Sequence, residues 1–85
     1  MRVDVQLFAR LRELAGRADV VCDVPAGATI RDVWQAVARA HPSLEPHSAN
    51  VSCARNDDFA RMTTPVHDGD AIAFLPPVSG GAPRF

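Results

Sequence analysis

The sequence predicts an α+β fold in which one main helix packs on a mixed sheet of about five strands. Three observations support this fold class. Two segments near the start alternate apolar and polar residues, as half-buried strands do. The segment that follows has the apolar periodicity of a helix on a sheet, and the final apolar run has the composition of a central strand. A hairpin, a crossover helix and a terminal strand in the middle of the sheet together make a β-grasp.

The first half of the chain contains the predicted hairpin. Residues 2–8 and 19–24 read as its two strands, and Ala9 to Gly16 reads as a short helical turn that ends at glycine. Pro25-Ala26-Gly27 ends the second strand. The residues expected to face the core are Val3, Val5 and Leu7 in one strand and Val20, Cys22 and Val24 in the other.

The amphipathic helix is expected over residues 29–41. Thr29 is its predicted N-cap, and Asp32 three residues later makes a variant of the capping box. Pro42 stops the helix. Its apolar stripe recurs at the spacing of one helix face and consists of Ile30, Val33, Trp34, Val37 and Ala38. We expect this stripe, including Trp34, to pack on the sheet as core.

The second half is predicted to add three strands, at 51–55, 59–62 and 71–75. A loop over residues 41–50 precedes them. Asn56-Asp57-Asp58 is expected to form a turn, because its residues tolerate left-handed backbone conformations. His67-Asp68-Gly69-Asp70 reads as a second turn. The last strand is apolar almost throughout, which is typical of a strand in the middle of a sheet.

Composition and charge limit the classes of partner. The chain has 85 residues, of which 47% are hydrophobic and 22% charged, so we expect one globular domain over residues 1–75 and an extended tail over 76–85. The net charge of -1 argues against nucleic-acid binding. No apolar run approaches the roughly 20 residues of a membrane span, and no signal-peptide pattern opens the sequence, so we expect a cytoplasmic protein without a membrane partner.

The body of the chain lacks a catalytic or metal-binding pattern. The histidines have no partner at zinc spacing, and the Asp57-Asp58 pair reads as a solvated turn, so we expect no metal and no bound cofactor. Cys22 and Cys53 are expected to pack as small buried residues. Any chemistry must therefore be supplied by the tail.

The tail reads either as a flexible terminus or as a thin arm that reaches another protein. Pro76-Pro77 should hold the exit extended, and Gly80-Gly81 can pass through a slot too narrow for side chains. At roughly 3.3 Å per extended residue, Pro76 to Gly81 reaches on the order of 20 Å. That distance is about enough to enter a neighbouring active site.

Two parts of the sequence resemble one known family. Asp68-Gly69-Asp70, the strand after it and Phe74-Leu75-Pro76-Pro77-Val78-Ser79-Gly80-Gly81 are similar to the MoaD/ThiS family of sulfur carriers. Phe8 to Gly16 also looks like that family's first strand and turn, so the resemblance covers nearly the whole chain. The family includes the small subunit of molybdopterin synthase and the thiamine sulfur carrier. The resemblance implies the ubiquitin-like version of the β-grasp.

The resemblance further implies a function and a site. A small subunit of molybdopterin synthase donates sulfur from a C-terminal glycine thiocarboxylate in molybdenum cofactor biosynthesis. Gly81 would then be the residue that an ATP-dependent adenylyltransferase, related to the ubiquitin-activating family, adenylates. The synthase large subunit would supply the catalytic side chains and the substrate, cyclic pyranopterin monophosphate. The remaining tail or partner-binding candidates are Gly80, Ser79, Pro77, Pro76, Leu75 and Phe74, the last two being equally explained as core.

Ala82-Pro83-Arg84-Phe85 departs from the family pattern, in which chains usually end at the second glycine. A peptide bond after Gly81 leaves no carboxylate there to adenylate. Three explanations stay open: a precursor segment that a JAMM-type protease removes, a cloning remnant, or a homologue without sulfur transfer. Two other functions also stay open. One is a related carrier for thiamine, cysteine or a secondary metabolite, and the other is a non-catalytic ubiquitin-like binding module.

Overall fold

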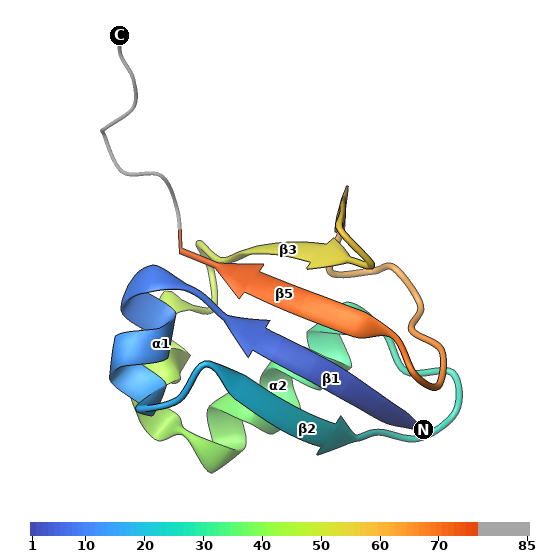
Figure 1. The fold of residues 1–85 in the computed structure, drawn as a ribbon, viewed down its shortest axis with the longest axis horizontal. Helices are drawn as coiled ribbons and strands as arrows, with labels where there is room; N and C mark the ends of the chain where they lie inside the picture. Colours follow the sequence, from blue (N-terminus) through green and yellow to red (C-terminus); the bar gives the residue numbers. More distant parts are fainter. Residues whose placement is uncertain (77–85) are drawn as a thin grey trace, which may run out of the picture.

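The computed structural model describes residues 1–76, which form one mixed sheet with helices against one of its faces (Figure 1). The elements are β1 (Arg2–Leu7), α1 (Ala9–Ala15), β2 (Asp19–Asp23), α2 (Ile30–Ala40), the 3-10 helix η1 (Pro42–His47), β3 (Ser52–Arg55), β4 (Asp58–Ala60) and β5 (Ala71–Leu75). The strand order is β2-β1-β5-β3-β4. Only the β1–β5 pair is parallel among these strands. This architecture confirms the predicted α+β fold of the β-grasp type.

The predicted hairpin is formed by β1 and β2, with Val3 opposite Cys22 and Val5 opposite Val20. The expected helical turn between them is α1. It ends at Gly16, whose φ of 78° lies in the left-handed region, and whose N–H donates to the Arg12 carbonyl at 2.9 Å. Glycine reaches this conformation without the steric penalty of a Cβ atom, so the sequence stops the helix where predicted.

The main helix, α2, crosses one face of the sheet (Figure 1). Thr29 is its N-cap, and the predicted capping box with Asp32 is present: the Thr29 N–H donates to Asp32 Oδ2 at 2.9 Å. Trp34 is only 3% exposed, and its ring meets the ring of Phe74 edge-on with centroids 5.0 Å apart. The prediction that Trp34 belongs to the core is confirmed.

Two local predictions were wrong. The segment predicted as a loop over residues 41–50 contains η1, which begins at Pro42 and buries Leu44. Proline is accepted in the first turn of a helix, so Pro42 ends α2 and starts η1. The fourth strand begins at Asp58 and ends at Ala60, because the left-handed turn consists of Asn56 and Asp57 alone, with φ of 50° and 74°.

Alternation along the strands separates a covered inner face from an uncovered outer face. Val3, Val5 and Leu7 of β1 are buried with Ile72 and Phe74 of β5 on the inner face, against α2. Because neighbouring strand residues point to opposite faces, the residues between them lie on the outer face. No helix within residues 1–76 is long and apolar enough to cross a membrane.

Candidate functional site at the exit of the central strand

The residues predicted to form the tail follow directly after the central strand in the sequence. β5 lies between β1 and β3, with Leu7 opposite Phe74 and Leu75 opposite Ser52. The Phe8 N–H donates to the Phe74 carbonyl at 3.2 Å, so the chain is held on both sides up to its exit. Strands bonded on two sides are the most constrained part of a sheet. The exit point is therefore fixed relative to the rest of the molecule.

Of the predicted site residues, three lie within the described part of the chain. Phe74 is fully buried beside Trp34, so its place is in the core, the second of the two roles considered for it. Leu75 and Pro76 are half-buried at the exit. The other predicted site residues, Pro77, Ser79, Gly80 and Gly81, lie outside the described residues.

Apolar side chains gather on the outer face next to the exit. Phe59 of β4 is 82% exposed and Phe8 is 42% exposed. The register places Phe59 opposite Ala54, and Ala54 opposite Ala73, so these residues form one row across three strands. Phe8 follows inward-facing Leu7 in extended conformation and so shares the outer face with Leu75. We call this set the outer band: Phe8, Ala54, Phe59, Ala73 and Leu75.

The sequence alone did not identify the outer band apart from Leu75. Its members come from four separate segments, and only the strand register brings them together. One signal was available, because Phe59 is a large aromatic residue in a short strand next to a polar turn. Large exposed apolar side chains gathered on one face commonly mark a protein interaction site.

A polar network holds the start of β5, where the Asp68-Gly69-Asp70 turn meets β1 and the β3–β4 turn. Asp70 is buried and accepts hydrogen bonds from the His67 N–H at 2.8 Å and from Asn56 Nδ2 at 3.1 Å. Arg55 Nε lies 4.0 Å from the same carboxylate. The Gly69 N–H donates to the Arg2 carbonyl at 2.7 Å. We call Asp70, Asn56, His67 and Arg55 the Asp70 network.

The Asp70 network stabilises the charged form of its carboxylate. Burial alone would raise the pKa of Asp70, but the hydrogen bonds from His67 and Asn56 and the nearby Arg55 charge together lower it below its usual value. Asn56 also accepts a hydrogen bond from the Ala71 N–H at 2.9 Å through its side chain. The Asp-Gly-Asp sequence thus positions the first residue of β5, and with it the strand that leads to the exit.

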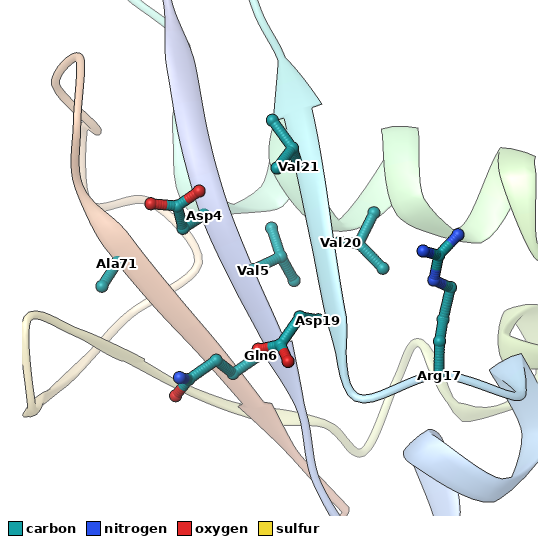
Figure 2. A pocket seen from close by; sticks show the side chains of 8 residues that line it. All are labelled: Asp4, Val5, Gln6, Arg17, Asp19, Val20, Val21 and Ala71. Carbon is teal, nitrogen blue, oxygen red and sulfur yellow. The ribbon is translucent and has the colours of Figure 1, made fainter.

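A hollow beside β1 and β2 on the described surface shows no catalytic arrangement. It has a volume of about 570 Å³, and Figure 2 shows its lining side chains from β1, β2 and their neighbours. Asp4, Gln6 and Asp19 supply polar groups, but Arg17 forms no ion pair with either carboxylate within residues 1–76. Across the same residues, no group of three or more His, Cys, Asp or Glu could hold a metal ion.

The two cysteines are buried, as predicted. Burial raises the pKa of the Cys22 thiol, with the nearby Asp23 charge adding to the effect, and burial also raises the pKa of the Cys53 thiol. Cys53 donates its S–H to the Ala60 carbonyl with an Sγ to oxygen distance of 3.3 Å. A raised pKa keeps a thiol protonated at neutral pH, and the thiol is then a poor nucleophile. Both residues act as packing groups.

Comparison with known proteins adds information about the tail as well as the body. A family model described as the ThiS family matches residues 5–81. The molybdopterin synthase sulfur carrier subunit of Arabidopsis thaliana is 35% identical over 81 residues, which cover 95% of this chain and 84% of that protein.

Two solved structures have the same fold. The crystal structure of SAMP1 from Haloferax volcanii matches with a TM-score of 0.83 at 34% identity, over 95% of this chain and all of that one. A complex of subunits 1 and 2 of the molybdopterin-converting factor from Helicobacter pylori contains a chain that matches with a TM-score of 0.66. That chain is 26% identical, and the match covers 95% of this chain and 100% of that one.

Proposed function

The chain belongs to the ThiS family, and from this premise we propose that it is the sulfur-carrier subunit of a molybdopterin synthase. One observation carries the proposal: the family match runs through the strand exit to the second glycine and ends there, at Gly81. The relative from Arabidopsis thaliana, whose name states this role, supports the choice of pathway. In this role the folded body presents the tail, and Gly81 carries the reacting group.

The proposed chemistry begins at a free carboxylate of Gly81. A carboxylate is a poor electrophile, because its charge repels nucleophiles and its oxygen is a poor leaving group. Reaction with ATP on a ubiquitin-activating-like adenylyltransferase forms an acyl adenylate and releases pyrophosphate. A sulfur nucleophile then displaces AMP and leaves a thiocarboxylate at Gly81. ATP is used by the activating enzyme, and the carrier needs no cofactor of its own.

Residues 82–85 require a prior step in this scheme. Because Gly81 is joined to Ala82 by a peptide bond, that bond must be hydrolysed before Gly81 has a carboxylate. We propose that a protease removes Ala82 to Phe85. Gly80 gives clearance next to the reacting residue, and Pro76-Pro77 restrict the direction of the arm.

The proposed partner is the large subunit of the synthase, which accepts the tail and supplies the catalytic side chains. The outer band offers a surface for this partner, since it is apolar, uncovered by helices and next to the strand exit. The Helicobacter pylori complex supports this proposal, because its two subunits are assembled with each other. A partner seated on the outer band would lie within reach of an arm that begins at Pro76.

Reconstitution tests the proposal. A chain ending at Gly81 is loaded with sulfur, mixed with the synthase large subunit and supplied with cyclic pyranopterin monophosphate. We expect formation of the dithiolene of molybdopterin and loss of sulfur from Gly81. A matched chain with Gly81→Val should give no product, since the branched side chain restricts the backbone and meets the walls of a narrow channel.

The second candidate function is a sulfur carrier for another pathway. It is favoured by the likeness to SAMP1, whose name does not refer to molybdopterin synthase. The same loaded chain distinguishes the two. If sulfur leaves Gly81 only with a thiamine or cysteine precursor system, and never with the synthase large subunit, the second candidate replaces the first.

A further inference from the structure

A second hollow lies on the opposite side of the sheet from the outer band. It has a volume of about 360 Å³ and lies between α2 and the segment from η1 to β3. We call it the α2 groove. Its apolar lining comes from Trp34, Val51 and Met62, and its polar lining includes Arg31, Gln35 and Glu45.

The strand register places this groove beside the chain exit. Leu75 is paired with Ser52, and the residue before Ser52 is Val51, which lines the groove. Alternation along the strand puts Val51 on the same side as buried Cys53, which is the side of α2. A chain that leaves Leu75 and turns toward the helix side therefore meets the groove first at Val51.

The groove presents an apolar wall and one charge of each sign, Arg31 and Glu45. The indole N–H of Trp34 donates to Ser48 Oγ at 2.8 Å, which ties the segment after η1 to α2. Val51 and Met62, both half-buried, offer an apolar surface that covers the ring of Trp34 beneath them. Within residues 1–76, neither Glu45 nor Arg31 forms an ion pair. The groove thus accommodates a short segment that carries an apolar ring and a positive charge placed beside Glu45 rather than Arg31.

We propose that the α2 groove binds Ala82-Pro83-Arg84-Phe85 of the same chain. Phe85 would pack against Val51 and Met62, and Arg84 would pair with Glu45. The occupant is covalently attached next to the groove, which raises its effective concentration there. From Pro76 the chain reaches about 30 Å at Phe85 if extended, so length does not limit the contact.

This contact gives the four residues a second role, which rests on the proposed function. While they occupy the α2 groove, Gly81 is retained on the helix side of the sheet, away from the outer band. Removal of Ala82 to Phe85 then creates the Gly81 carboxylate and frees the arm in a single step. The docking itself does not depend on sulfur transfer, so the two can fail separately.

Amide NMR spectra of two chains, 1–85 and 1–81, test the docking without any enzyme. We expect the signals of Gln35, Ala49, Val51 and Met62, and the indole N–H signal of Trp34, to differ between the chains. The signals of Val21 and Phe59, on the outer face, should coincide. In the longer chain, Phe85→Ala should move the groove signals to their positions in the shorter one.

A charge variant provides the matched control. Glu45→Gln in the longer chain should shift the Trp34 indole signal toward its position in the 1–81 chain, whereas Glu13→Gln, at an exposed carboxylate on α1, should not. Coincident groove signals in the two chains would overturn the proposal. Groove shifts that disappear on dilution would also overturn it, because the occupant would then be a second copy of the chain.

Discussion

Asp70 shows how one side chain positions the strand that ends in the tail. Its carboxylate is buried at the start of β5 and is bonded by the His67 N–H and by Asn56. Asn56 in turn receives a hydrogen bond from the Ala71 N–H, the first residue of the strand. A buried carboxylate without hydrogen-bond partners would destabilise the folded protein. The turn is therefore held in the conformation that keeps these hydrogen bonds formed.

Asp70→Asn should therefore lower the free energy of unfolding by about 1–3 kcal/mol at neutral pH. The pKa of Asp70 is lowered in the folded state, so its stabilising effect is present above the unfolded value of about 3.9 and is lost as the pH falls through the folded value. Urea unfolding of both proteins across this range measures the difference.

The difference in the free energy of unfolding between wild type and Asp70→Asn should accordingly shrink as the solution is acidified below about pH 4. Asp58→Asn, at an exposed carboxylate in the same region, is the control and should change stability little. If the difference in the free energy of unfolding between wild type and Asp70→Asn does not vary with pH, the pKa of Asp70 is not lowered in the folded state.

At the scale of elements, local signals explain which predictions succeeded. Three features were predicted correctly: the N-cap of α2, its apolar stripe and the glycine that ends α1. Each depends only on residues close together in the sequence, so the sequence was sufficient to predict them. The 3-10 helix η1 has two prolines and no apolar periodicity, and Leu44 is its one buried residue. Its conformation follows from packing against α2 and α1, which local patterns do not report.

The capping box of α2 allows a test at this scale. Thr29→Ala removes the side-chain oxygen that accepts from the Asp32 N–H at 3.4 Å, so we expect the free energy of unfolding to fall by about 1 kcal/mol. Thr63→Ala, at an exposed threonine, is the matched control. Thermal and urea unfolding measure both variants. If Thr29→Ala and Thr63→Ala have the same free energy of unfolding, the capping hydrogen bond does not contribute to stability.

At the scale of the whole molecule, the sheet separates two surfaces that the sequence did not reveal. The outer band and the α2 groove each collect residues from distant segments, and only the pairing of β3 with β5 places both beside the exit. The tail was recognisable from sequence because its residues are contiguous. Its docking residues were not, since strand register depends on long-range contacts.

The outer band makes a prediction about partner binding. Phe59→Ser should leave the free energy of unfolding nearly unchanged, because the ring is largely exposed. It should weaken binding of the synthase large subunit by roughly tenfold or more, the usual effect of removing an aromatic anchor. Val21→Ser, at another exposed apolar residue outside the band, is the control. Titration calorimetry that finds equal affinities for both variants would exclude the band as the docking surface.

The most direct test of the central claim is the intact mass of two chains after incubation with the activating enzyme, ATP and a sulfur donor. We predict that the chain ending at Gly81 gains the mass of an oxygen-to-sulfur exchange, while the chain ending at Phe85 keeps its original mass. Fragmentation should locate the added sulfur at Gly81. A Gly81-ended chain that stays unmodified with its cognate activating enzyme, or sulfur found at Cys22 or Cys53, would contradict the role of sulfur carrier.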